Sequence, residues 1–188
     1  MTAAALSVVV RDAVEDDIAA VQAIYAYYVT RTTSSFEEVP PTVDEITARF
    51  RATRARGLPY LVADVDGELL GFTYAGPFRT RSAYRYTIEN SIYTAPSVAR
   101  RGIGSVLLTA LIERCTALGY RQMIAVIGDS ANLASIGLHR KFGFRQEGVL
   151  RGVGLKFGRW IDAVIMHRPL AGDDAPLPAI AMLRPDEL

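Results

Sequence analysis

The chain has 188 residues, of which 50% are hydrophobic and 22% are charged, and its formal net charge is +1. This composition is typical of a globular protein, and it argues against a disordered chain or a surface that attracts nucleic acid or membrane as a whole. The length suits a single domain, which we place at residues 1–170, with a tail at 171–188.

The N-terminal part of the chain predicts a strand, a helix and a loop. Residues 6–11 are β-branched and bounded by polar residues, which favours a strand. Residues 12–28 follow with helical periodicity, and their apolar face contains Ile18, Val21, Ile24, Tyr25 and Tyr28. The polar segment 30–41 ends in two prolines and predicts a loop.

The next segment predicts a second helix and a β-hairpin. Thr42 and Glu45 form a capping-box pattern, so a helix is expected from here to about residue 56. An Asp-Gly pair then separates strands predicted at 61–65 and 68–78, and this dipeptide favours the tight turn of a hairpin.

A further strand and a helix follow in the middle of the chain. After a polar break at 79–83, residues 84–94 are rich in β-branched and aromatic residues and predict a strand. A glycine-rich turn comes next and opens an amphipathic helix, which Gly119 is expected to end.

The C-terminal part predicts a buried strand at 123–127, a helix at 132–142, and a hairpin of strands at about 144–157 and 159–167. The complete order is β-α-α-β-β-β-α-β-α-β-β. This order predicts a mixed α/β fold, in which one sheet carries helices on both faces.

The turn before the third helix has the composition of an anion-binding site. Arg100 and Arg101 precede Gly102 and Gly104, and the helix begins there. Glycine lets the backbone approach a phosphate closely, and the first N–H groups of a helix favour an anion. The plainer alternative is a strand–helix turn with solvated arginines. Leu107 stands where a dinucleotide fold needs a third glycine, and the Gly-Lys-Ser/Thr of a P-loop is absent.

Five short segments carry a family resemblance. They are 36–40 (FEEVP), 85–93 (RYTIENSIY), 100–105 (RRGIGS), 132–139 (NLASIGLH, leading into FGF) and 154–162 (GLKFGRWID). In this order they resemble the GNAT acyltransferase superfamily, and within it the phosphinothricin and methionine sulfone/sulfoximine N-acetyltransferases. The likeness covers nearly everything from residue 6 to residue 170.

The resemblance implies a GNAT-like fold whose sheet is largely antiparallel and splayed between its fourth and fifth strands. It implies acetyl-CoA as the acyl donor, no metal, and direct transfer to the amino group of a small amino-acid-like acceptor with a carboxylate. It also implies a homodimer. Trp160 packs either at the subunit interface of that dimer or inside one chain.

The resemblance assigns acetyl-CoA binding to a strand end, the glycine-rich turn and the helix that follows the next strand. The residues are Ile92, Tyr93, Thr94, Arg100, Arg101, Gly102, Ile103, Gly104, Ser105, Asn132 and Ser135. Ordinary strand pairing, helix capping and small-residue packing are alternative roles for those outside the turn. Ala99 departs from the family's usual Gln or Arg, but backbone N–H groups do most of the anion binding in such a nest.

Two residues match catalytic positions of the family. Glu89 lies within a strand and matches an acidic base that acts through water, although an exposed glutamate or an ion pair with Arg85 is the plainer interpretation. His139 matches a residue that assists proton transfer, and a histidine on a helix surface is its alternative. Backbone amides near Ile92 and Tyr93 are expected to polarise the thioester carbonyl.

Arginines beside this strand suit an anionic acceptor. Arg79 and Arg85 match arginines of the subfamily, and arginine binds a carboxylate bidentately. Further residues resemble acceptor contacts of the subfamily, namely Phe36, Glu38, Phe78, Asn90 and Ser91. Core packing is an equal alternative for Phe36, and ordinary strand polarity is the alternative for the Asn-Ser pair.

The remaining chemistry-bearing residues are few. Cys115 continues the apolar face of its helix, and a single cysteine fits a reducing cytoplasm. Two histidines without a Cys/His cluster argue against a zinc site, and we assign His167 no role. No apolar run approaches the ~18 residues that a membrane span needs, and the formal net charge is only +1, so neither a membrane nor a nucleic acid is expected as a partner.

Two other functions fit the same motifs less well. A non-catalytic acetyl-CoA sensor needs only the phosphate turn, whereas this chain also carries Glu89, His139 and the arginine pair. An acetyltransferase for protein N-termini would want an open groove, and one for aminoglycosides an acidic pocket. The arginines favour an anionic acceptor instead.

Overall fold

The computed structural model describes residues 8–99 and 101–172. Its elements are β1 (Val9–Asp12), α1 (Ile18–Arg31), α2 (Val43–Ala55), β2 (Tyr60–Val65), β3 (Glu68–Pro77), β4 (Thr87–Thr94), α3 (Ile103–Ala117), β5 (Gln122–Gly128), α4 (Leu133–Lys141), β6 (Arg145–Lys156) and β7 (Arg159–Pro169). The predicted order of strands and helices is confirmed. Residues 6–7 of the first predicted strand, Arg100, and the tail from residue 173 lie outside the described residues.

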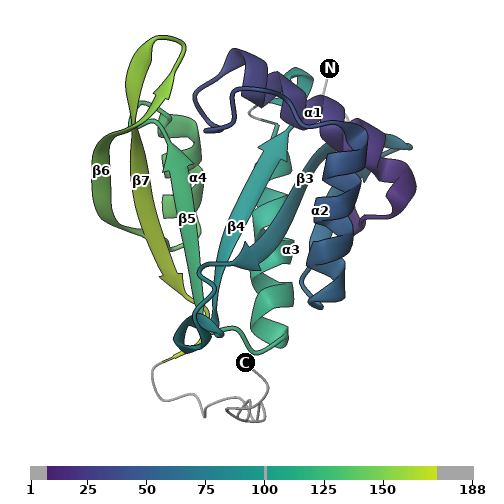
Figure 1. Cartoon of the computed structure of the whole chain (residues 1–188). Coiled ribbons are helices and arrows are strands. Elements are labelled where there is room, and N and C mark those ends of the chain that lie inside the picture. Colours follow the sequence, from purple (N-terminus) through teal and green to yellow (C-terminus); the bar gives the residue numbers. More distant parts are fainter. Residues whose placement is uncertain (1–7, 100, 173–188) are drawn as a thin grey trace, which may run out of the picture.

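The seven strands form one sheet in the order β1-β2-β3-β4-β5-β7-β6. Figure 1 shows the part of this order from β3 to β6. All neighbouring strands are antiparallel except β4 and β5. These two pair in parallel only from Thr87↔Gln122 to Asn90↔Ala125, although both strands continue beyond that point. The predicted splay between the fourth and fifth strands is therefore confirmed, and we call the place where they separate the fork.

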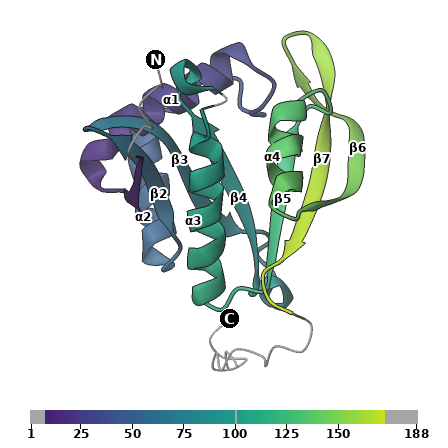
Figure 2. The same cartoon turned by 180° about the vertical axis from the view of Figure 1, so that it is seen from behind.

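Helices cover both faces of the sheet, as predicted. α1 and α2 pack against β2, β3 and β4 and lie in front of the sheet in Figure 1, and α3 and α4 lie on the other face in Figure 2. Under α1 and α2 the core is aromatic, with Tyr60 stacked on Tyr74 at 5.0 Å and Phe72 on Tyr93 at 5.3 Å. Under α3 it is aliphatic, built around Leu107 and its neighbours.

Side chains of β4 alternate between these two faces, because successive residues of a strand point in opposite directions. Tyr93 packs in the aromatic core under α1 and α2, so Glu89 and Ser91 share that face. Ile88 and Ile92 pack in the core under α3, so Asn90 lies on the opposite face from Glu89. This separation decides the geometry of the site.

Some predicted boundaries are wrong by a few residues. The first helix begins at Ile18 instead of residue 12, after a 3-10 turn at Glu15–Asp17. The N–H of Ala13 bonds Tyr60 O and the N–H of Val14 bonds the Asp17 carboxylate, so these residues extend the strand edge and cap the turn. β4 begins at Thr87 instead of residue 84, because a second 3-10 turn occupies Ser82–Tyr84.

Among the described residues, no helix is both long enough and apolar enough to cross a membrane.

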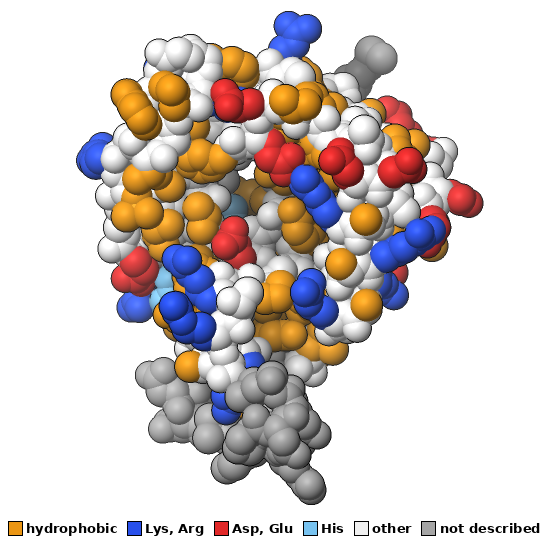
Figure 3. All heavy atoms as spheres, viewed as in Figure 1, with side chains coloured by type: hydrophobic (Ala, Val, Ile, Leu, Met, Phe, Trp, Pro, Cys, Tyr) orange, Lys and Arg blue, Asp and Glu red, His pale blue; other side chains and the backbone are white. Residues whose placement is uncertain are grey.

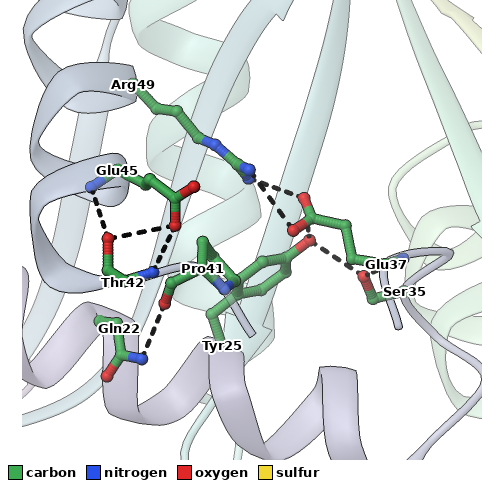
Figure 4. Close-up of polar contacts among 8 residues, drawn as sticks. All are labelled: Gln22, Tyr25, Ser35, Glu37, Pro41, Thr42, Glu45 and Arg49. Carbon is green, nitrogen blue, oxygen red and sulfur yellow. Dashed lines mark hydrogen bonds and ion pairs between the residues drawn. The ribbon is translucent and has the colours of Figure 1, made fainter. Parts of the chain in front are cut away.

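The predicted capping box at the start of α2 is confirmed, as Figure 4 shows. The hydroxyl of Thr42 accepts from the N–H of Glu45 at 3.2 Å, and the N–H of Thr42 donates to the Glu45 carboxylate at 2.6 Å. We predict that Thr42→Ala lowers the free energy of unfolding by about 1 kcal/mol, measured by urea denaturation. Thr47→Ala is the matched control, because its exposed hydroxyl only bonds Val43 O within the helix. Equal stability of the two variants would contradict the capping role.

Candidate functional site

A cavity of about 660 Å³ occupies the fork between β4 and β5. The separated strand ends, the first turn of α3 and the first two turns of α4 form its walls. Most of the residues that the resemblance assigned to acetyl-CoA line it, namely Ile92, Tyr93, Thr94, Gly102, Ile103, Gly104, Ser105, Asn132 and Ser135. Arg101 is exposed and is not part of this lining, and Arg100 lies outside the described residues.

The first turn of α3 presents backbone N–H groups at the edge of this cavity. Gly102 caps the helix with φ of 88°, a left-handed conformation that suits glycine. Intrahelical bonding starts with Ser105 N–H, which donates to Gly102 O at 2.9 Å, so the N–H groups of Ile103 and Gly104 precede the first N–H that donates within the helix. A Cβ on Gly104 would stand 3.2 Å from Leu138, so glycine also keeps α3 and α4 close here.

The backbone of β4 offers polar groups to the cavity beyond the fork. The N–H of Ala95 bonds Leu70 O on β3, and the β3–β4 register is regular, so alternate residues of β4 direct their backbone groups to β3. Ile92 and Thr94 therefore face the fork, and Tyr93 directs its N–H to β3. The hydroxyl of Tyr28 donates to Thr94 O at 2.8 Å. Ile92 is the residue whose N–H and C=O are best placed to pair with an extended ligand.

His139 is buried at the inner end of the cavity, with 2% of its surface exposed. The alternative of a histidine on the helix surface is therefore wrong. Its Nε2 lies 3.0 Å from Asn90 Oδ1, and its Nδ1 lies 2.8 Å from the carbonyl oxygen of Ser135. Burial lowers the pKa of His139, and the hydrogen bond to the Ser135 backbone opposes that shift.

Asn132 caps α4, as the sequence predicted for its local role. Its Oδ1 accepts from Ser135 N–H at 3.2 Å, and its Nδ2 donates to the hydroxyl of Ser34 at 3.2 Å. The second bond connects α4 to the loop after α1, and both Asn132 and Ser34 line the cavity. Ser34 carried no signal in the sequence, because it stands in a polar loop without a motif.

Glu89 lies on the other face of the sheet from His139, half-buried in the middle of β4. Burial raises the pKa of Glu89, and the charge of Arg79 opposes this shift. The ion pair with Arg85 that the sequence allowed is not formed. Arg85 instead stacks on Tyr86 at 5.0 Å and donates to Ser82 O. Figure 3 shows this face of the molecule hollowed near its centre, with acidic and basic side chains around the hollow.

The other residues predicted to contact the acceptor are divided between the two faces. Arg79 lies over the ring of Phe78 at 5.1 Å, near Glu89. Ser91 shares the face of Glu89, whereas Asn90 is 5% exposed and points to His139. The contact between Asn90 and His139 could not be predicted from the sequence, because it depends on the register of β4 with β5.

Phe36 and Glu38 lie on the loop between α1 and α2, and both are exposed. Simple core packing of Phe36 is therefore wrong, since 42% of its surface is exposed. Its ring lies against Gly154 on β6, where an added Cβ would come within 2.5 Å of it. The loop thus reaches from the α1–α2 side of the molecule to the β6–β7 hairpin.

Polar contacts hold this loop on both sides, and Figure 4 shows those on the helix side. The hydroxyl of Tyr25 lies 2.9 Å from that of Ser35 and donates to Glu37 at 3.0 Å, and Arg49 on α2 bonds Glu37 at 2.7 Å. On the sheet side, the buried ammonium of Lys156 donates to Ser35 O at 2.7 Å. The sequence gave no signal for Lys156, because a lysine beside a hairpin turn is usually exposed.

The remaining predictions for this region concern Cys115 and metals. Cys115 is fully buried under α3, as predicted, and burial raises the pKa of its thiol to about 12. Among the described residues, no three His, Cys, Asp or Glu side chains are grouped so that they could hold a metal ion.

Comparisons with known proteins agree with this geometry. The model of the acetyltransferase (GNAT) family matches residues 21–144. The chain is 55% identical to a phosphinothricin N-acetyltransferase of Alcaligenes faecalis, over 90% of this chain and 85% of that protein. It is 42% identical to an L-methionine sulfoximine/L-methionine sulfone acetyltransferase of Pseudomonas paraeruginosa, over 86% of this chain and 94% of that protein.

Solved structures give the same result. The crystal structure of a GNAT superfamily phosphinothricin acetyltransferase from Sinorhizobium meliloti, in complex with AcCoA, superposes with a TM-score of 0.89. The two chains are 42% identical, and the match covers 97% of this chain and 98% of the other.

Proposed function

The chain belongs to the acetyltransferase (GNAT) family, and on this premise we propose that it acetylates the amino group of a small amino-acid-like acceptor that carries a carboxylate. It is an N-acetyltransferase, and acetyl-CoA is its acyl donor. The observation that carries the proposal is the cavity in the fork, with the half-buried carboxylate of Glu89 on one face of β4 and the buried His139 on the other.

The residues around the cavity fit a coenzyme A thioester. The N–H groups of Ile103 and Gly104, at the positive end of the α3 dipole, suit its pyrophosphate. The backbone of Ile92 suits the amides of an extended pantetheine arm, as an added strand pairs with an open sheet edge. Acetyl-CoA supplies an activated acetyl group when it is bound there.

We assign the proton transfers to the two faces of β4. Glu89 takes the proton of the acceptor's ammonium through water, and its raised pKa suits a general base near neutral pH. The N–H of Ile92 faces the cavity and polarises the thioester carbonyl, whereas that of Tyr93 is directed to β3. His139 protonates the leaving thiolate. Cys115 is no nucleophile, because its buried thiol stays protonated.

The acceptor proposed here has the features that the named relatives' substrates share. Phosphinothricin, methionine sulfoximine and methionine sulfone each carry an amino group, a carboxylate and a tetrahedral polar group. Arg79 is the residue we assign to the carboxylate, because it lies near Glu89. Arg85, which stacks on Tyr86, is the second candidate for binding the carboxylate. We propose that the acceptor is also contacted by Phe36, Glu38, Phe78 and Ser91.

A sensor without catalysis is the main alternative. It would need the phosphate site alone, whereas burial here raises the pKa of Glu89 and lowers that of His139, and both shifts suit proton transfer.

A reducing cytoplasm, inferred from the single cysteine, remains a prediction for the location of the protein.

The first test is release of free coenzyme A from acetyl-CoA with a panel of amines. We predict turnover with phosphinothricin, methionine sulfoximine or methionine sulfone, and none with the same compounds as methyl esters, because the ester removes the charge that Arg79 binds. Aminoglycosides and peptides with free N-termini serve as the other acceptor classes. Binding of acetyl-CoA without turnover on any amine would favour the sensor.

The second test concerns the base. We predict that Glu89→Gln lowers kcat/KM by about 100-fold or more at neutral pH, while Glu113→Gln, an exposed change on α3, leaves it unchanged. Because the base must be ionised, the rate should fall as the pH falls through a value above the ordinary carboxyl pKa. Arg79→Ala should move this acidic limb to higher pH, since Arg79 lowers the pKa of Glu89. A shift of the acidic limb to lower pH in Arg79→Ala would contradict the interaction between Arg79 and Glu89.

We further propose that the β6–β7 hairpin is the interface of a homodimer. More than half of the surface is exposed for five large apolar side chains there, which are Leu150, Val153, Leu155, Phe157 and Trp160. Figure 3 shows hydrophobic side chains gathered over this part of the molecule, at the upper left. Burial of Trp160 inside one chain is wrong, since 68% of its surface is exposed. A patch of this kind on a single chain usually marks an interaction site.

We predict that the wild-type protein elutes with twice the 20.5 kDa mass of the chain in size-exclusion chromatography with light scattering. Trp160→Glu should convert it to a monomer at micromolar concentration, because a charge would be buried in an apolar interface. Leu133→Glu, also highly exposed but on α4, is the control and should remain a dimer. A monomeric wild type would refute the interface.

A further inference from the structure

Asn90 connects the two halves of the sheet to His139 at the fork. Its Nδ2 lies 3.0 Å from Ile124 O on β5, and its Oδ1 lies 3.0 Å from His139 Nε2. A backbone carbonyl can only accept, so the amide nitrogen of Asn90 must face Ile124 and its oxygen must face the imidazole. Asn90 therefore presents an acceptor to Nε2, and this nitrogen must carry a proton to bond it.

The other ring nitrogen faces two oxygens of a single residue. Nδ1 lies 2.8 Å from the carbonyl oxygen of Ser135 and 3.5 Å from its hydroxyl oxygen. A protonated Nδ1 donates to the carbonyl, or to the hydroxyl oxygen when the hydroxyl gives up its own proton, and an unprotonated Nδ1 accepts from the hydroxyl, which can rotate its proton inward. Both states of Nδ1 thus have a partner, whereas only the protonated state of Nε2 has one.

The surroundings of His139 are otherwise apolar. Phe144 packs edge-on against the ring at 5.0 Å. Arg140 and Lys141, the charged neighbours on α4, are exposed, and Glu89 lies on the opposite face of the sheet. Within the described residues, no charged side chain contributes to the pKa shift of His139. The state of the ring is therefore governed by burial, Asn90 and Ser135.

We propose that Asn90 is a positioning residue that keeps a proton on Nε2 of His139 in both charge states, so that His139 exchanges its Nδ1 proton through the Ser135 hydroxyl. This rests on the proposed function, because the proton goes to the sulfur of the departing coenzyme A. The hydroxyl proton forms the S–H bond, and the Nδ1 proton re-forms the O–H bond. The imidazolium becomes a neutral imidazole, which takes up a proton from bulk solvent before the next turnover, and the proton that Glu89 removes from the acceptor is released to solvent. Ser135 lines the cavity, which gives the route an exit.

The test reads the two nitrogens directly, by long-range ¹H–¹⁵N NMR of histidine-labelled protein across the titration of His139. The chain has two histidines, and His167→Gln assigns the signals. In the neutral wild-type ring we expect the proton on Nε2. Asn90→Asp keeps an acceptor and should keep that tautomer. Asn90→Leu removes it, so the proton should move to Nδ1, where Ser135 O still accepts. The Nε2–H tautomer in Asn90→Leu would overturn the proposal.

Kinetics test the route of the proton. Ser135→Ala keeps the carbonyl but loses the hydroxyl, so it should retain the tautomer while kcat falls at least about tenfold. Unchanged kcat would overturn the relay, and thermal unfolding confirms that each variant is folded.

If the wild type releases no coenzyme A with any amine, the proposed function fails. The NMR spectra still decide the role of Asn90 in that case, because they need no turnover.

Discussion

The early end of the parallel pairing between β4 and β5 is the constraint on which the site depends. Pairing stops at Asn90 and Ala125, while both strands continue, and their free edges form the walls of a cavity of about 660 Å³. Backbone groups buried without a partner are costly, so such an edge favours a ligand that can pair with it. Asp129, directly after β5, is bonded by Thr33 of the loop after α1 and by Arg159 of β7 at 2.5 Å, so the end of β5 is connected to these elements and not to β4.

Because side chains alternate along a strand, the adjacent residues Glu89 and Asn90 lie on opposite faces of β4 and take part in different contacts. Glu89 belongs to the face covered by α1 and α2, where Arg79 and the loop carrying Phe36 are found. Asn90 belongs to the other face, where it contacts His139 on α4. A thioester held in the fork would lie between them, so a proton can be removed on one side and returned on the other. Neither group needs to move for this, which is consistent with catalysis by positioning.

Local patterns in the sequence were sufficient for much of this account. The Asp-Gly hairpin, the Thr42 capping box and the glycine at the start of α3 each depend on residues close in sequence, and all are confirmed. The direction of the Asn90 side chain could not be predicted, because it depends on pairing with a strand 34 residues away. Lys156 was missed for the same reason, since its partner Ser35 lies 121 residues away. Helix α1 begins at Ile18 instead of the predicted residue 12, because the Asp17 carboxylate accepts from Val14 N–H and caps the 3-10 turn before the helix.

The most direct test of the central claim is calorimetric titration of acetyl-CoA into a protein whose fork is filled. A Cβ at Gly104 would already stand 3.2 Å from Leu138 and within 4.0 Å of Thr94 and Ile92, so Gly104→Val fills this end of the cavity. Gly137→Ala, which has open space around it on α4, is the control. The account predicts normal binding for the control and at least about tenfold weaker binding for Gly104→Val, about 1.4 kcal/mol. Equal affinity in the wild type and Gly104→Val would place the cofactor elsewhere and contradict the account.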